Sequence, residues 1–144
     1  MSQEQTQQLL YEMQMLESHI TELNRRESSL EAVLREAIAA TQSIKSLEGT
    51  TPVKSLVPLG LGAFARTEIY PNAKLIVNIG AGIAVEKEHG SAINYIESRI
   101  KEIDVAMQDT ASRKHEAIER MEQGRQVISN MGKAAAKPSA KTNV

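Results

Sequence analysis

Two long stretches of this chain repeat apolar residues in alternating steps of four and three. The first stretch runs over Leu9, Met13, Leu16, Ile20, Leu23, Glu27, Leu30, Leu34, Ala37, Thr41 and Ile44, and only Glu27 and Thr41 are polar. The second runs over Ile93, Ile96, Ile100, Ile103, Met107, Thr110, Lys114, Ala117, Met121, Gly124, Ile128 and Met131, interrupted at Thr110, Lys114 and Gly124. A repeat of about 3.5 residues is typical of coiled-coil helices, and we call these positions the seam. Such a chain encloses little volume for chemistry, so its function is expected to lie in its surfaces.

The composition agrees with an elongated protein. The 144 residues include one Phe, three Tyr and no Trp, so an ordinary core would lack its usual bulk. The formal net charge of -1 gives no general attraction to nucleic acid or to an anionic membrane. There is no cysteine, and no stretch approaches the ~20 apolar residues of a membrane span. These features predict a soluble, cytoplasmic, single-domain protein with no nucleic-acid or membrane partner.

The helix boundaries follow from capping and breaking residues. Ser2, with Gln5 three residues on, is a suitable cap for a first helix over residues 3–47, which Gly49 and Pro52 would end. Ser91 is the expected cap of a second helix over residues 91–132. Their similar lengths predict an antiparallel pair within one chain. Together with the intervening segment they form one domain, residues 1–132, and residues 133–144 are expected to be a disordered tail.

The segment between the helices reads as β structure. A Gly-x-Gly unit occurs at residues 60–62 and again at residues 80–82, and paired glycines permit the positive φ values of tight hairpins. We predict two hairpins within residues 53–87: residues 53–58 with 63–69, and residues 74–79 with 83–87, joined at 70–73. A phosphate-binding loop is disfavoured because the third glycine of that motif is absent and no helix follows either unit.

Two isolated hairpins leave an apolar face and several strand edges uncovered. The simplest way to cover both is for hairpins of several chains to join in a barrel, which makes the protein an obligate oligomer. The fold class is therefore α+β: two long helices in an antiparallel coiled coil, linked by two β-hairpins that join an intersubunit β-barrel. The residues expected to mediate oligomerisation are Leu56, Val57, Leu59, Phe64, Leu75, Val77, Ile79, Ile83 and Val85.

No catalytic or metal site is predicted. The three histidines, His19, His89 and His115, are scattered and lack partners at metal-ligand spacing. No serine lies in a nucleophile-elbow motif, and the acidic residues belong to helix faces. We therefore expect no enzyme activity, no catalytic residue, no metal and no cofactor.

The polar interruptions of the seam constrain the register. If Leu47 lies near Gly90, paired residue numbers sum to about 137, which places Glu27 near Thr110 and within one layer of Lys114. A Glu27–Lys114 pair would fix the alignment of the helices more than it would stabilise them. Alternatively, both side chains extend to water at the margin of the seam. The sequence leaves both possibilities open.

The same register brings the two free helix ends together. Leu10, Tyr11 and Met15 lie off the seam, so the narrow apolar stripe cannot bury them. Methionine is flexible and suits surfaces that contact many partners. We expect an exposed apolar protein-binding patch here, the alternative being a loosely packed coiled-coil end. The candidate binding residues are Leu9, Leu10, Tyr11, Met13, Met15, Val127, Ile128 and Met131.

The segment between the heptad helices resembles a known family. Residues 56–64 read LVPLGLGAF and residues 75–87 read LIVNIGAGIAVEK. With the flanking helices, over about residues 5–132, this arrangement resembles the prefoldin family of holding chaperones, and most closely its archaeal alpha class, which two hairpins distinguish from the beta class. One departure is Ala84, where many relatives carry a larger residue.

The resemblance implies an assembly of two alpha and four beta subunits, in which the hairpins form a double β-barrel platform and the coiled coils extend as tentacles. It further implies that the tentacle tips hold non-native client proteins without ATP and deliver them to a group II chaperonin. The competing interpretation is a structural coiled-coil scaffold subunit with a single defined partner. Exposed apolar tips discriminate between the two, because a scaffold has no use for Leu10, Tyr11 and Met15 in water.

Overall fold

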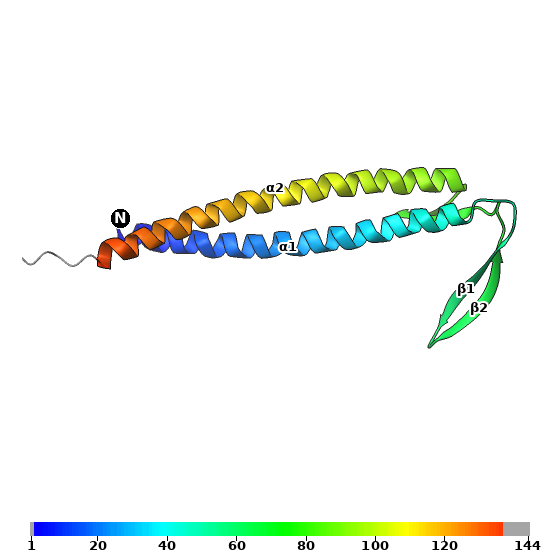
Figure 1. Cartoon of the computed structure of the whole chain (residues 1–144), viewed down its shortest axis with the longest axis horizontal. Helices are drawn as coiled ribbons and strands as arrows, with labels where there is room; N and C mark the ends of the chain where they lie inside the picture. Colours follow the sequence, from blue (N-terminus) through cyan, green and yellow to red (C-terminus); the bar gives the residue numbers. More distant parts are fainter. Residues whose placement is uncertain (1, 137–144) are drawn as a thin grey trace, which may run out of the picture. The chain divides into compact units, whose positions relative to one another are not determined.

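The computed structural model describes residues 2–136 of the chain (Figure 1). The elements follow in the order α1 (Gln3–Ser46), β1 (Val53–Gly60), β2 (Ala63–Ile69), β3 (Leu75–Gly80), β4 (Ile83–Lys87) and α2 (His89–Ala136). The predicted order of two long helices around two hairpins is confirmed. The chain divides into two compact units. We call them the terminal unit, which holds α1 up to Leu30 and α2 from Ala106, and the central unit, Glu31–Val105.

The first helix begins and ends where local chemistry dictates. The Ser2 hydroxyl oxygen accepts a hydrogen bond from the Gln5 amide at 3.3 Å, and Gln5 Oε1 accepts one from the Ser2 amide at 2.9 Å. This reciprocal pair is the predicted capping box. At the other end the Leu47 amide donates to the Ile44 carbonyl at 3.1 Å, and Gly49 follows with φ +141°. The tightened last turn and the glycine end α1.

The start of the second helix differs from the sequence prediction. Ser91 is not its cap, because α2 already begins at His89 and the Glu88 carbonyl accepts a hydrogen bond from the Ala92 amide at 2.9 Å. Strand β4 ends at Lys87, so Glu88 alone links strand to helix and takes the cap position.

The end of the second helix also differs. We expected the tail to begin at residue 133, but α2 continues to Ala136 because Lys133 and the alanines after it are strong helix formers. The remainder of the expected tail, residues 137–144, lies outside the described residues.

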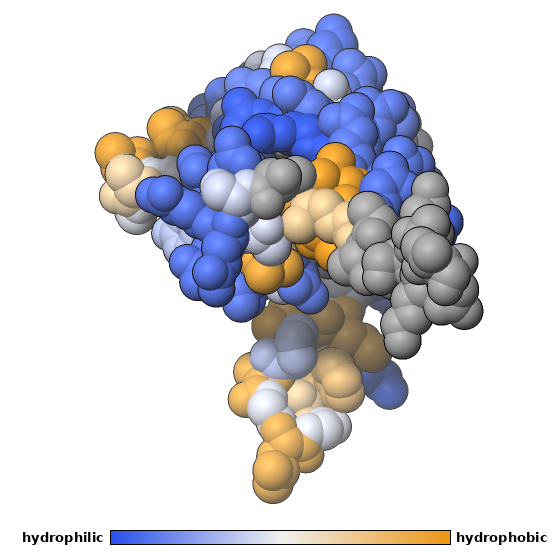
Figure 2. All heavy atoms as spheres, turned by 90° about the vertical axis from the view of Figure 1, so that its left-hand side faces the viewer, coloured by the Kyte–Doolittle hydropathy of each residue, from blue (hydrophilic) through white to orange (hydrophobic). Residues whose placement is uncertain are grey.

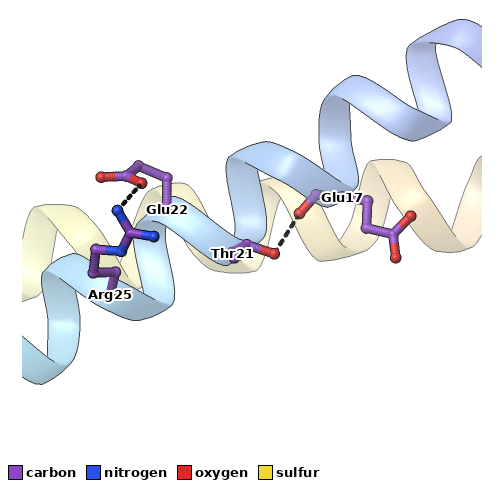
Figure 3. A network of polar contacts seen from close by, with 4 residues as sticks. All are labelled: Glu17, Thr21, Glu22 and Arg25. Atoms are coloured by element: carbon purple, nitrogen blue, oxygen red, sulfur yellow. Dashed lines mark hydrogen bonds and ion pairs between the residues drawn. The ribbon is translucent and has the colours of Figure 1, made fainter.

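The outer surface of α1 is held by short local contacts (Figure 3). The Thr21 hydroxyl donates to the Glu17 carbonyl at 3.0 Å, and Arg25 forms an ion pair with Glu22 at 3.5 Å. Both side chains of the ion pair are largely exposed, and exposed pairs at this spacing add only about 0.5 kcal/mol. The stability of these helices therefore depends mainly on their buried seam.

The predicted seam is confirmed in both units. Every seam position from Leu9 to Ile44 and from Ile93 to Met131 is buried or partly buried. The two seam threonines, Thr41 and Thr110, are among the most buried residues, and their hydroxyls donate to the carbonyls of Ala37 and Ala106 at 3.0 and 2.7 Å. Their buried hydroxyls are thus satisfied within the same helix.

Glu27 and Lys114, the two charged residues on the seam, form an ion pair. In the terminal unit, Lys114 Nζ lies 3.3 Å from Glu27 Oε1, and the two side chains are 27% and 32% exposed. Of the two alternatives, pairing is therefore the one observed. The contact joins α1 to α2 in the predicted antiparallel register.

Both predicted hairpins are present, as two separate two-stranded sheets, β1–β2 and β3–β4. The turn residues Leu61 and Gly62 have φ values of +49° and +79°, and Ala81 and Gly82 have +53° and +75°. Two positive φ values are what the favoured two-residue hairpin turns require. The Ala73 amide donates to the Tyr70 carbonyl at 3.0 Å and closes the predicted connection.

Each hairpin also contains a bulge that the sequence analysis did not predict. The pairing register shifts by one residue at Leu59 and at Ile79, just before the turn. In the second hairpin the Asn78 side chain accepts a hydrogen bond from the Gly80 amide at 2.9 Å, which satisfies a donor that the shifted ladder leaves open.

The Glu27–Lys114 contact generates a prediction. Replacing either residue alone by Leu should destabilise the protein, because the partner charge stays partly buried, whereas Glu27→Leu with Lys114→Leu should restore or raise thermal stability. A double-mutant cycle from chemical denaturation should give a coupling free energy of about 1 kcal/mol. Purely additive effects would show that the two side chains do not interact.

Candidate protein-binding surfaces

The first hairpin carries apolar side chains on both faces. Leu56 and Val57 are adjacent in β1 and therefore point to opposite sides. Phe64, which pairs with Pro58, shares the side of Leu56, and Ala65 pairs with Val57 on the other. Leu56 is 62% exposed and Phe64 is 57% exposed. The Leu56 side of this hairpin is thus left uncovered by the described chain, whereas most residues on the Val57 side are partly buried.

The second hairpin has one apolar and one mixed face. Val77 pairs with Val85, and Leu75 pairs with Lys87, so these four residues share a side. The Lys87 ammonium lies 5.6 Å from the centre of the Tyr95 ring of α2, close enough for a cation–π contact. The opposite side presents Ile76, Asn78, Ala84 and Glu86. The Val77 side is therefore the more apolar of the two, although Leu75, Val77 and Lys87 are already partly buried within the chain.

The residues predicted for oligomerisation all lie in these hairpins. Leu59 and Ile79 occupy the bulges, and Ile83 begins β4. The described strands form no closed barrel, and each two-stranded sheet leaves its outer edges unpaired. The hairpins thus offer apolar area and backbone hydrogen-bonding groups that other chains can cover.

The sequence analysis missed two exposed residues in the hairpins. Leu61 is fully exposed at the tip of the first hairpin and adopts a left-handed φ, which costs a non-glycine residue about 1 kcal/mol. Ile76 is exposed on the mixed face of β3. The signal for Leu61 in the sequence is a large apolar residue between the two glycines of the first Gly-x-Gly unit.

The free helix ends, in the terminal unit, expose the predicted off-seam side chains. Leu10, Tyr11 and Met15 are 49%, 62% and 56% exposed. Viewed from this end, apolar residues form separate orange groups within a mainly hydrophilic surface (Figure 2). The other candidates lie on or beside the seam: Leu9, Met13, Ile128 and Met131 are partly buried, and Val127 is on its margin.

Three of these candidates, Leu9, Met13 and Val127, line a groove between the helix ends. Its apolar lining is Leu9, Met13, Leu16 and Val127, with Gly124 among them and with Glu12, Arg120 and Gln123 beside it. From the sequence, Leu16 and Gly124 are expected only as seam positions and not as part of a binding groove. A glycine at a seam position in the middle of a helix was the signal that could have identified the groove.

Among the described residues, no group of three or more His, Asp or Glu side chains is placed to hold a metal ion. His115 instead lies 3.2 Å from Glu119 of the same helix, with both side chains exposed. No described helix is both long and apolar enough to cross a membrane.

Comparisons with known proteins agree with this architecture. The family described as prefoldin subunit matches residues 3–134. A prefoldin subunit alpha of Nitrosopumilus maritimus is 51% identical over 93% of this chain and 92% of its own length. A prefoldin subunit alpha of Archaeoglobus fulgidus is 33% identical over 72% of this chain and 76% of its own.

Two solved structures share the fold. Filamentous PFD from Methanocaldococcus jannaschii, determined by cryo-EM, gives a TM-score of 0.65 at 23% identity over 76% of this chain and 92% of that one. The crystal structure of the prefoldin beta subunit from Thermococcus strain KS-1 gives a TM-score of 0.61 at 15% identity, over 94% of this chain and 95% of that one.

Paired heptad helices joined by β-hairpins are the architecture that this chain shares with these prefoldin structures. The chain belongs to the prefoldin family. Within that family it is similar to the archaeal alpha subunits, as its two hairpins had indicated.

Proposed function

We propose that this chain is an alpha-type subunit of a hetero-oligomeric chaperone that holds non-native proteins at the free ends of its coiled coil, without ATP, and delivers them to a group II chaperonin. The observation that carries this proposal is the exposure of Leu10, Tyr11 and Met15 at the helix ends. A non-native client exposes apolar side chains, and contact between two apolar surfaces releases water at about 25 cal/mol per Å² buried.

Assembly is the second part of the proposal. The uncovered hairpin faces and open strand edges support joining with beta-type subunits through a shared β-barrel, with two alpha and four beta chains as the expected stoichiometry. Several weakly binding ends on one platform would hold a client by avidity while each contact exchanges quickly. Fast exchange suits transfer to a second chaperone.

The proposal includes the cellular compartment, which is the cytoplasm. The absence of cysteine is compatible with a reducing cytoplasm, where a group II chaperonin would receive the client. A purely structural scaffold with one defined partner is disfavoured, because large apolar side chains exposed at its ends would lower its solubility without serving it.

Assembly can be tested on the two faces of β3. Val77→Asp places a charge on the apolar face, at a cost of several kcal/mol if that face is buried, so the oligomer should dissociate while helix content persists. Ile76→Asp, on the mixed face of the same strand, is the matched control and should leave the oligomer intact. Analytical ultracentrifugation and circular dichroism measure the two properties. An intact oligomer for Val77→Asp would exclude a buried barrel face at this position.

Client holding can be tested by truncation. Removing residues 1–11 together with residues 127–144 should abolish suppression of aggregation of an unrelated denatured protein, because Leu10 and Tyr11 are lost together with the apolar residues at the end of α2 and Met15 alone remains of the exposed trio. The oligomer should remain, since the hairpins are untouched. Light scattering and size-exclusion chromatography report the two outcomes, and added ATP should change neither. Undiminished protection by the truncated oligomer would place the binding surface elsewhere on the helices.

A further inference from the structure

Gly124 is a glycine in the interior of α2, where glycine is unusual. Gly124 is buried at a seam position, although glycine weakens a helix relative to alanine. Its backbone has no positive φ that would require glycine. Of the eight glycines, it alone has a neighbour that an added Cβ would meet: the new atom would overlap Met13 Sδ and lie 3.4 and 3.5 Å from Met13 Cε and Cγ. Met13 therefore occupies the space that a side chain at position 124 would take.

The position of Met13 leaves a groove open next to it. With its thioether end lying against the α2 backbone, an apolar groove of about 230 Å³ remains open along Leu9, Leu16 and Val127. This volume is large enough for a bulky apolar side chain such as that of leucine and too small for a folded element.

The polar margin of the groove indicates what else the occupant carries. Glu12 and Arg120 line it with opposite charges, and neither forms an ion pair within the described part of the chain. A carboxylate can accept from a peptide N–H, and a guanidinium can donate to a peptide carbonyl. An extended segment, whose backbone groups are unpaired, offers both.

We propose that Gly124 is a specificity-determining residue for client capture: by seating Met13 against α2, it keeps this groove open for one bulky aliphatic side chain of an extended client segment. Because the margin carries both signs of charge, the segment can be acidic or basic. This inference rests on the proposed holding function and assigns it a particular recognition element.

The critical variant is Gly124→Ala. The new methyl group would displace the thioether end of Met13, which has three rotatable bonds and can turn into the groove. Helix content should stay the same or rise, because alanine favours the helix. Affinity for an apolar client segment should nevertheless fall about tenfold, as expected when one aliphatic side chain is no longer buried.

The measurement uses the full-length chain in its assembled oligomer and a fluorescent, unstructured twelve-residue peptide of Ser, Thr and Gly with one central Leu. Fluorescence anisotropy gives its affinity, and the same peptide with central Ala reports the contribution of the side chain. Wild type should prefer Leu over Ala about tenfold, and Gly124→Ala should lose this preference.

One control separates closure of the groove from stiffening of the helix. Gly132→Ala lies in the same helix, where an added Cβ meets nothing within 4 Å, and it should bind like wild type.

The outcomes distinguish this inference from the proposed function. If wild type suppresses aggregation and prefers the Leu peptide but Gly124→Ala does so equally, the role of Gly124 is wrong and the holding function stands. If wild type neither binds the peptide nor suppresses aggregation, both the inference and the proposed function fail.

Discussion

The structure depends on a seam that is only two positions wide in every seven. Packing along this stripe buries the residues that hold α1 to α2 within each unit, and it replaces the core that a chain with a single Phe and no Trp could not build. A narrow stripe also has a limit: it cannot cover apolar side chains at other helix positions. Leu10, Tyr11 and Met15 remain exposed for this geometrical reason.

The seam also contains its own alignment device. Two apolar stripes of similar composition can slide past each other by a heptad at small cost, whereas a misaligned Glu27 or Lys114 would stay unpaired against apolar neighbours. Fixing this alignment places Met13 opposite Gly124 in the same unit. The groove at the helix ends therefore depends on the Glu27–Lys114 contact, which lies about three to four turns away along the helices.

The hairpins meet a different physical constraint. A two-stranded sheet cannot satisfy its outer edges or cover its faces, so exposed apolar residues such as Leu56, Phe64 and Ile83 would become buried if another chain packed on them, as we propose. Membership of the prefoldin family agrees with this reading, because it implies the role of a chaperone subunit in a larger complex. In the function we propose, the helix ends contact clients and the hairpins mediate assembly.

The sequence by itself determined the elements of this fold and the side chains that its seam buries, because heptad periodicity, the Ser2–Gln5 box and the paired glycines act over a few neighbouring residues. It could not determine the α2 cap, since Ser91 suits a cap as well as Glu88 does and only the end of β4 selects between them. Whether Glu27 meets Lys114 or reaches water was likewise decided by the packing of two helices. The groove beside Gly124 required the tertiary structure as well, because it arises where Met13, distant in sequence, fills the space of a missing side chain.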